Sequence, residues 1–466
     1  MRKQEPRKLR SKPHTVSGRI VSRRGVLHNQ RVYGKSAGSR LATFTIVVVV
    51  AAFLVGLLCS TVFAMRSQLF YSAHKSEIKK IVKPSEEAIW RKELERISKK
   101  RAKDSINPNS YAVRSVLAKM SLEDKIAQMF IVKPEELVGF YGIVTSSGPQ
   151  MQQAFNSLPV GGVMYSRENI QNPEQTKTMI NGLQEMSEAR VGLPAFISVD
   201  EEGGTVARVS SNPSMGVQAS PNMRDVGATG KTRNAYKIGS YIGKYLYDFG
   251  FNVDFAPVAD VVTNPDNKLM EKRAFGSKAQ LVTRMTTAFA DGLQDSHVFA
   301  TYKHFPGHGS TFSDSHKGVT VSNQTSLALR KTDLVPFKDA VYTHAKFIMV
   351  SHVSYPKVTF DDTPASMSEK IITGIARKKL GYSGILISDS LGMGAITQRY
   401  DPGAAAITGI KAGLDMLLSS ANLRQAYYAV VNAVRRGDIS KDRIDESVKR
   451  IIAVKLQIAK YQKLSK

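Results

Sequence analysis

Lysine, histidine and aspartate residues gather around a Gly/Pro-rich turn in the stretch KHFPGHGSTFSDSH, residues 303–316. The histidines of this stretch are His304, His308 and His316. Asp314 lies two residues before His316, and a carboxylate so placed can hold an imidazole in one tautomer and raise its proton affinity. The glycines and the proline predict a loop that could carry this acid–base pair to a substrate. Two other interpretations stay open, namely a zinc site with H-x3-H-x7-H spacing and a polar surface loop.

Charged side chains are distributed unevenly along the 466 residues, whose formal net charge is +27. Residues 1–40 contain 12 Lys/Arg and 1 acidic residue, whereas residues 111–466 contain 42 and 32. More than half of the positive excess therefore lies outside the part that we expect to fold. A nucleic-acid-binding protein would carry its excess on a surface with a recognisable motif, and the sequence contains none that we recognise. We expect no nucleic-acid partner.

An uncharged stretch, LATFTIVVVVAAFLVGLLCSTVFAM, occupies residues 41–65 between two arginines. Its length is that of one membrane-spanning helix. The preceding residues 1–40 are basic, which favours a cytoplasmic N-terminus. The sequence thus predicts a cytoplasmic tail, a transmembrane signal anchor embedded in membrane lipid, and a single-pass protein of the cell membrane whose remainder is extracytoplasmic. A cleaved signal peptide is the alternative. The one cysteine, Cys59, lies in this stretch, so cysteine usage does not report the compartment.

Residues 66–110 mix basic and acidic side chains and contain few large apolar residues, which predicts a charged linker or stalk. In residues 111–466, short apolar runs alternate with helical patterns. The expected strands are 128–132, 160–165, 195–200, 252–258, 298–305, 346–353, 384–389 and 413–418, and examples of the expected helices are 174–189, 231–248 and 334–344. This alternation predicts an α/β fold, a (β/α)8 TIM-type barrel, with an open doubly wound sheet as the alternative.

Ionisable residues occur in or directly after several of these apolar runs. They are Asp200, Asp254, Arg273, Lys303, His304, His352 and Asp389. In a barrel the carboxyl ends of the strands converge on one mouth, where catalysis takes place. Taken singly, Asp389 could cap the following helix and Asp254 could support the barrel from inside. Taken together, these residues predict one polar site.

The order of these segments resembles glycoside hydrolase family 3, in its bacterial β-N-acetylglucosaminidase (β-N-acetylhexosaminidase) branch, over residues 118–460. The segments that carry the resemblance are SLEDKIAQM, LPVGGVMYSRENI, VDEEGGTVAR, FNVDFAPVADV, KRAFGS, KHFPGHG followed by DSH, and SDSLGMGAI. Two stretches depart from the family pattern. The connection between the first two expected strands, residues 135–158, is longer than the family pattern. The segment that leads to Arg273, NPDNKLMEKRAFGS, also differs from the usual sequence.

The resemblance implies a catalytic barrel over residues 111–466 and a role for each matching residue. Asp389 would be the nucleophile, and His316, assisted by Asp314, the acid/base. The residues implied to bind the sugar are Asp200, Arg208, Arg273, Lys303 and His304. His308 is expected to serve the structure of the loop. Because 77 residues follow Asp389, we expect no second catalytic domain, and no metal or organic cofactor is required.

The expected activity is retaining exo-hydrolysis of terminal β-linked N-acetylglucosamine, with peptidoglycan-derived fragments as the carbohydrate substrate. Four alternatives remain open. They are phosphorolysis of the same bond, β-glucosidase activity, a zinc hydrolase, and a membrane-anchored glycan-binding protein without activity.

Overall fold

The computed structural model describes residues 105–312, 315 and 318–464, and the isolated positions 92, 95, 96 and 99. All of them belong to one compact unit, Pro84–Lys466. The predicted tail, the predicted anchor and most of the predicted stalk lie outside the described residues, as do Asp314 and His316. No described helix combines the length and apolar character that crossing a membrane requires.

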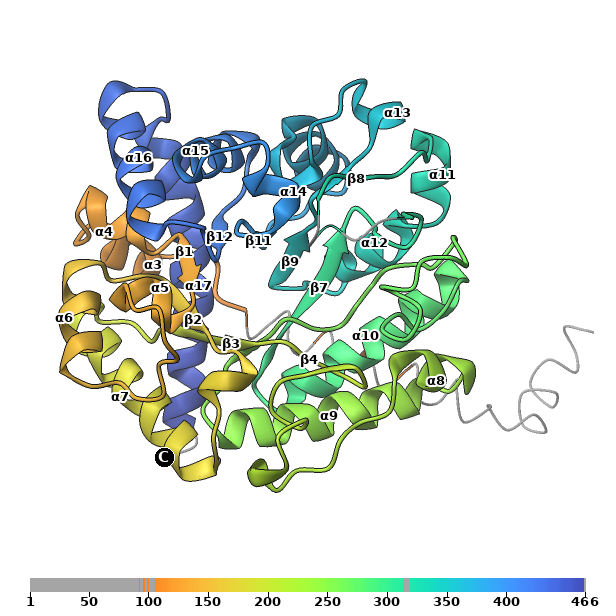
Figure 1. Cartoon of the computed structure of the whole chain (residues 1–466), viewed down its shortest axis with the longest axis horizontal. Coiled ribbons are helices and arrows are strands. Elements are labelled where there is room, and N and C mark those ends of the chain that lie inside the picture. Colours follow the sequence, from red (N-terminus) through yellow and green to blue (C-terminus); the bar gives the residue numbers. More distant parts are fainter. Residues whose placement is uncertain are drawn as a thin grey trace, which may run out of the picture. The chain divides into compact units, whose positions relative to one another are not determined.

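Eight parallel strands form a closed barrel, which confirms the predicted TIM-type architecture (Figure 1). In chain order the strands are β1 (Phe130–Val132), β2 (Gly162–Met164), β3 (Phe196–Val199), β6 (Val253–Asp254), β7 (Phe299–Phe305), β9 (Phe347–Val350), β11 (Ile385–Ser390) and β12 (Met416–Leu418). Each pairs with the next, and β12 pairs with β1 to close the ring. Every expected strand overlaps one of these.

The fourth barrel strand is shorter than expected. The apolar run 252–258 predicted seven residues, whereas β6 covers Val253–Asp254. Pro257 has no N–H group to donate to a neighbouring strand, so it interrupts the ladder. The pairing resumes only as an isolated bridge between Val258 and Lys303.

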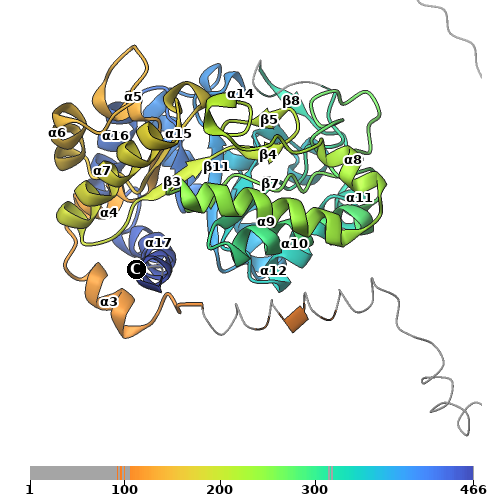
Figure 2. The same ribbon diagram turned by 90° about the horizontal axis from the view of Figure 1, so that it is seen from below.

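Helices surround the barrel, and α9, α10 and α12 cover one side of it (Figure 2). The longer helices are α7 (Pro173–Val191), α9 (Thr232–Asp248), α10 (Ala279–Asp295), α12 (Leu334–Tyr342), η4 (Lys370–Lys379), α15 (Pro402–Ala412), α16 (Leu423–Arg436) and α17 (Lys441–Leu464). The shorter ones are α3 (Tyr111–Leu117), α4 (Leu122–Ala127), α8 (Met223–Ala228), α11 (Ser326–Lys331), α13 (Pro356–Thr359), α14 (Gly394–Thr397), η1 (Arg167–Asn169), η2 (Pro213–Met215) and η3 (Ala365–Met367). The three helices named from the sequence are confirmed to within two residues at each end.

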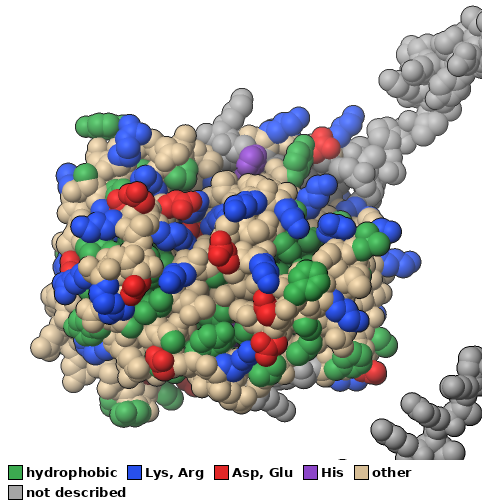
Figure 3. Space-filling model, turned by 90° about the horizontal axis from the view of Figure 1, so that it is seen from above, with side chains coloured by type: hydrophobic (Ala, Val, Ile, Leu, Met, Phe, Trp, Pro, Cys, Tyr) green, Lys and Arg blue, Asp and Glu red, His purple; other side chains and the backbone are tan. Residues whose placement is uncertain are grey.

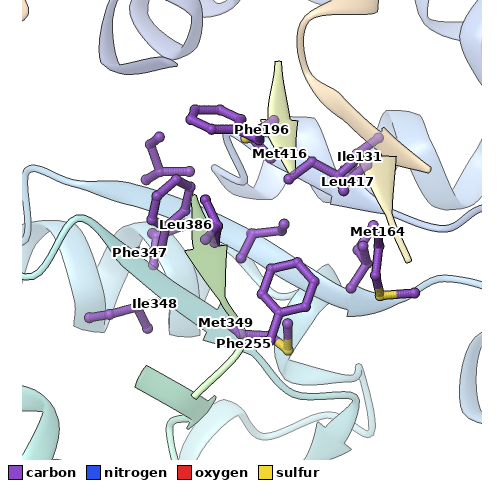
Figure 4. Packing of buried hydrophobic residues seen from close by; sticks show 14 of the residues in the cluster. Ile131, Met164, Phe196, Phe255, Phe347, Ile348, Met349, Leu386, Met416 and Leu417 are labelled. Atoms are coloured by element: carbon purple, nitrogen blue, oxygen red, sulfur yellow. The ribbon is translucent and has the colours of Figure 1, made fainter. Parts of the chain in front are cut away.

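Large apolar side chains from opposite strands fill the barrel interior (Figure 4). The rings of Phe196 and Phe347 meet edge to face, with 5.3 Å between their centroids. Met164 and Met349 are also buried, and both line the cleft described below. The apolar packing thus extends to the cleft, which rests on a rigid barrel.

Small elements not expected from the sequence follow several barrel strands. An antiparallel pair, β4 (Glu201–Gly203) with β5 (Val206–Ala207), comes directly after β3. The pair β8 (Thr320–Val321) and β10 (Val353–Ser354) joins the loops after β7 and β9. The long connection around residues 135–158 forms two helices, α5 (Pro134–Val138) and α6 (Pro149–Ser157). Segments that follow parallel strands lie at the carboxyl end of a barrel, where they can shape a site.

Candidate active site

A cleft of about 950 Å³ opens at the carboxyl ends of the barrel strands. The six described residues to which the family resemblance gave a role all line it: Asp200, Arg208, Arg273, Lys303, His304 and Asp389. Asp254 and His352, which the sequence also placed in one polar site, are not among the lining residues. The six lining residues come from five different strand ends and loops. The structure therefore brings together residues up to 189 positions apart in the sequence (200 and 389). Asp314 and His316 lie outside the described residues.

Lys303 and Arg273 converge on a buried carboxylate that the sequence did not single out, Glu202. The ammonium of Lys303 lies 2.6 Å from Asp200 Oδ1 and 2.7 Å from Glu202 Oε1. Arg273 binds Glu202 with two parallel hydrogen bonds, Nε to Oε2 at 2.8 Å and Nη2 to Oε1 at 2.7 Å. A two-pronged pair of this kind fixes the guanidinium plane.

The charges of this cluster stabilise one another. Burial alone would raise the pKa of Glu202, but the attraction of Arg273 and Lys303 outweighs it, so the pKa lies well below its usual range. Burial would lower the pKa of Lys303, and Asp200 and Glu202 reverse this, so the pKa is raised. Near neutral pH these groups are therefore ionised. They form a rigid set of donors and acceptors suited to sugar hydroxyls.

His304 is oriented by a second carboxylate that the sequence did not single out, Asp260. His304 Nδ1 lies 2.7 Å from Asp260 Oδ2. The other oxygen, Oδ1, accepts the backbone N–H groups of His308 at 2.6 Å and His304 at 3.3 Å. Burial opposes the charge of Asp260, yet His304 and His308 lower its pKa. One carboxylate thus fixes both the imidazole and the start of the loop.

Asp389, the penultimate residue of β11, lines the cleft. Its Oδ1 accepts the N–H of Ser390 at 2.7 Å. Burial would raise the pKa of Asp389, but the nearby His304 and His352, together with that N–H group, lower it below the ordinary value. His352 is itself fixed, because its Nδ1 lies 2.7 Å from Ser366 Oγ and its Nε2 lies 2.9 Å from Ser390 O. Asp389 therefore presents an ionised carboxylate rather than a helix cap.

Arg208 reaches the cleft from a turn that Glu201 holds. The buried Glu201 carboxylate accepts the backbone N–H groups of Arg208 and Val209 at 2.6 and 2.8 Å. It also accepts the Tyr245 hydroxyl at 2.7 Å. Asp254 is fully buried, does not line the cleft, and accepts the Glu201 N–H at 3.0 Å. This position matches the structural alternative that the sequence left open for Asp254.

His308 has a structural environment. Its Nδ1 lies 2.9 Å from Thr311 Oγ1 and its Nε2 lies 3.1 Å from Ser315 Oγ. Burial, reinforced by His304, lowers the pKa of His308 to about 4, so the ring is neutral near pH 7. Within the described part of the chain, no group of three or more His, Cys, Asp or Glu residues could hold a metal ion. The zinc interpretation requires His316, which lies outside that part.

Comparison with known proteins identifies the family of this barrel. The sequence profile described as "Glycosyl hydrolase family 3 N terminal domain" matches residues 121–454. The chain belongs to glycosyl hydrolase family 3. This family membership confirms the resemblance drawn from the motifs and makes the chain a glycoside hydrolase.

Relatives of this family member carry consistent names. It is 31% identical over 339 residues to β-hexosaminidase A of Pseudoalteromonas piscicida, covering 68% of this chain and 56% of that protein. It is 31% identical over 348 residues to β-hexosaminidase LpqI of Mycobacterium tuberculosis, covering 72% and 84%. The chain thus spans little more than half of the first relative and most of the second.

Solved structures agree with the sequence relatives. A glycoside hydrolase family 3 β-N-acetylglucosaminidase from Paenibacillus sp. superposes with a TM-score of 0.68 at 34% identity, covering 73% of this chain and 63% of that chain. M. tuberculosis LpqI superposes with a TM-score of 0.63 at 30% identity, covering 72% and 94%. At the level of the family, the β-hexosaminidase relationship is therefore supported by sequence and by structure.

Proposed function

We propose that the protein is a retaining exo-β-N-acetylglucosaminidase whose nucleophile is Asp389. The observation that carries the proposal is the position of Asp389, an ionised carboxylate in the same cleft as the cluster of Asp200, Glu202, Arg273 and Lys303. The cluster supplies donors and acceptors for the hydroxyls of one terminal sugar. Asp389 then faces the anomeric carbon of that sugar.

The reaction has two steps. In the first, an Asp389 carboxylate oxygen bonds to the anomeric carbon, and the bond to the leaving-group oxygen breaks as that oxygen receives a proton. In the second, a water molecule gives up a proton, attacks the same carbon and releases Asp389. The lowered pKa of Asp389 keeps it anionic for the first step. Arg208, Arg273, Lys303 and His304 hold the sugar while the ring carbon moves between the two oxygens.

The proton donor and acceptor in this proposal are His316 and its partner Asp314. Ser315, the described residue between them in the sequence, donates or accepts a hydrogen bond with His308 Nε2 at 3.1 Å. The Ser315 carbonyl accepts the N–H of Ala395 at 3.3 Å. Ala395 follows shortly after Gly392 and Met393, which line the cleft. These contacts tie Ser315 to the segment that lines the cleft, and this supports the proposal.

We further propose that the substrates are peptidoglycan-derived fragments outside the cytoplasmic membrane. The support is the uncharged span 41–65 with its basic flank, together with the β-N-acetylglucosaminidase named among the solved structures. Membrane lipid would then be a partner of that span only. The described barrel supplies the substrate site.

Release of a chromophore from aryl β-N-acetylglucosaminide, measured beside aryl β-glucoside, tests the proposal. We expect faster turnover of the N-acetylated substrate, with no requirement for phosphate and no loss with a chelator. Dependence on phosphate would indicate a phosphorylase, and loss with chelator would indicate a zinc enzyme. A faster reaction with the glucoside would indicate a β-glucosidase, and no turnover of either substrate would favour a binding protein.

Replacement of Asp389 tests its role as the nucleophile. Asp389→Asn keeps the shape and removes the charge, so turnover should fall by at least about 10³-fold while the fold persists. A 2-fluoro sugar should label the parent enzyme at Asp389. Asp438→Asn is the matched control, because Asp438 is an exposed partner of Arg436 and does not line the cleft. Near-parental turnover of Asp389→Asn would show that the assignment is wrong.

A further inference from the structure

One carboxyl group of the cleft has no part in the mechanism above. Glu136 lines the cleft from α5, which directly follows β1. Its Oε1 accepts a hydrogen bond from the hydroxyl of Ser419, and its Oε2 accepts the N–H of Lys133 at 3.3 Å. Two carboxylate oxygens offer about four acceptor positions. Glu136 therefore retains acceptor capacity toward the cleft.

Glu136 differs from the other carboxylates of the site in its partners. Asp200 and Glu202 each contact a cation directly, at 2.6 to 2.8 Å. No ion pair to Glu136 is found in the described part of the chain, where its hydrogen-bond partners are a hydroxyl and a backbone N–H. Burial raises the pKa of Glu136, and those two hydrogen bonds together with the charge of Lys133 only partly offset the effect. A partly buried acceptor that forms no direct ion pair is stabilised when a ligand donates to it.

The order of the strands places Glu136 on the same side of the mouth as Asp389. The sugar-binding cluster follows three consecutive strands, β3, β6 and β7. Asp389 lies near the end of β11, and β12 and β1 come next around the ring. Ser419, directly after β12, connects the two, because its carbonyl accepts the N–H of Gly392 at 2.9 Å while its hydroxyl donates to Glu136.

This arrangement constrains how a sugar can lie. Asp389 must contact the anomeric carbon, C1, so the hydroxyls on the far side of the ring point to the cluster after β3, β6 and β7. The substituent on C2, next to C1, stays on the Asp389 side. The strand on the other side of β11 is β9, which contributes the apolar Met349 to the cleft. On the β12–β1 side of Asp389, the carboxylate that lines the cleft is Glu136.

We infer that Glu136 is a specificity-determining residue that accepts a hydrogen bond from the amide N–H of the 2-acetamido group. The inference rests on the proposed function, since it requires a sugar bound with C1 at Asp389. It assigns to Glu136 the recognition of the N-acetylated sugar, in addition to its contacts with Ser419 and Lys133. A hydrogen bond to a charged group is strong enough to discriminate between substrates.

The test combines enzyme variants with substrate variants. Three aryl β-glycosides serve as substrates. The first carries a 2-acetamido group, the second is its 2-deoxy analogue, and the third is the 2-acetamido compound without its 6-hydroxyl. For the parent, kcat/KM with each substrate is measured, and the same is done for Glu136→Gln and Glu136→Ala. Taking ratios between enzymes cancels the intrinsic reactivity of each substrate.

We expect Glu136→Ala to lose roughly tenfold to a hundredfold more on the 2-acetamido substrate than on the 2-deoxy substrate. The loss of kcat/KM caused by removing the 6-hydroxyl from the substrate should be the same in the parent and in Glu136→Ala. Glu136→Gln keeps a neutral acceptor and should show a smaller C2-dependent loss. Equal losses on the 2-acetamido and 2-deoxy substrates would overturn the inference. It would also be overturned if removing the 6-hydroxyl affected Glu136→Ala differently from the parent.

Two control variants separate recognition from structural support. Ser419→Ala removes the hydroxyl that Glu136 accepts but leaves Glu136 in the cleft, so the C2-dependence should persist. Glu135→Gln changes the neighbouring glutamate, whose Oε1 accepts Val144 N–H at 2.8 Å and Asn169 Nδ2 at 2.6 Å. It should affect all substrates alike. If Ser419→Ala reproduced the effect of Glu136→Ala, the carboxylate would act only through Ser419 and the inference would fail.

The two proposals can fail separately. If the parent enzyme does not hydrolyse the aryl N-acetylglucosaminide, the proposed function is wrong, whatever Glu136 does. If the parent is active and the C2-dependent coupling is missing, only the role of Glu136 is wrong. Should Glu136→Gln instead spare good leaving groups and damage poor ones, Glu136 would be a proton donor, which also overturns the inference.

Discussion

At the residue scale, the carboxylates of the cleft differ in how many of their oxygens are already bound. Glu202 is bound tightly by Arg273 and Lys303, which lowers its pKa and occupies both of its oxygens. Asp389 has one backbone N–H on Oδ1, so its remaining lone pairs are available for bond formation. Two carboxylates of the same cleft thus differ in their free acceptor capacity because their neighbours differ.

The acid/base assignment makes a prediction that depends on the leaving group. In His316→Ala, the first step with a good aryl leaving group should survive, because such a group needs little protonation, whereas a sugar leaving group should lose about 10²-fold or more. The second step should suffer in both cases, and azide should relieve it. Pre-steady-state bursts with the two substrate types measure this. Uniform loss on all substrates, both in the variant and in the parent treated with chelator, with the activity of the parent restored by added zinc, would instead establish a metal site.

Asp314→Ala provides the matched pH test. The imidazole remains, but the carboxylate that raises its proton affinity is gone. The histidine pKa is therefore lower in the variant, and the limb of the pH–rate profile that reports loss of its proton should move to lower pH. An unchanged profile would show that Asp314 does not act on His316.

At the element scale, one buried aspartate joins three elements behind the cleft. Asp415, directly before β12, lies 3.0 Å from Arg450 of α17 and contacts Arg377 of η4. Its oxygens also accept the N–H of Leu386 in β11 at 2.9 Å. Burial opposes the charge of Asp415, but Arg377, Arg450 and Arg443 outweigh it and lower the pKa. The network thereby holds β11, which carries Asp389.

We predict that Asp415→Asn destabilises the barrel by about 3–5 kcal/mol near pH 7, because it leaves buried arginines without their counter-ion. Since the folded-state pKa of Asp415 is lowered, its contribution is present above the ordinary pKa and is lost as the pH falls through the folded value. Urea unfolding of parent and variant should therefore differ most at neutral pH and converge below about pH 4. A constant difference across that range would contradict the prediction. Asp438→Asn, at an exposed pair, should change stability by less than about 0.5 kcal/mol.

At the scale of the whole molecule, the distribution of charge along the chain carries more information than its distribution on the visible surface. Figure 3 shows Lys and Arg side chains interspersed with acidic and apolar ones on one face of the molecule. The strongest basic bias of the sequence lies in residues 1–40, before the uncharged span. We interpret this bias as a topological signal rather than a binding surface.

The topology prediction follows from that bias. Residues 66–466 should lie outside the cytoplasm, attached by a helix over residues 41–65. Protease added to intact spheroplasts should remove the barrel while a cytoplasmic marker is preserved. Protection of the barrel would contradict this topology. A soluble mature form that begins near Met65 would show that the span is a cleaved signal peptide.

The sequence alone determined the barrel and the meeting of several polar residues in its cleft. Hydrophobic runs of strand length alternating with helical patterns can be buried in few ways, so eight strands and the convergence of Asp200, Lys303 and Asp389 followed from local pattern and topology. Pro257 shortens one strand because it has no backbone N–H group to donate. Each strand and helix depends on residues near one another in the chain, and the order of the strands then brings their carboxyl ends together.

Only the tertiary structure decided which polar groups become partners. Glu202 stands beside Asp200 and Glu201 in the sequence, and nothing local shows that it faces Arg273 and Lys303 while Glu201 turns to backbone N–H groups. Likewise Glu136 reaches Ser419 across 283 residues of chain. Hydrogen bonds and ion pairs act over a few ångströms in space regardless of sequence separation. The folded barrel therefore sets the charge, the neighbours and the role of each of these side chains.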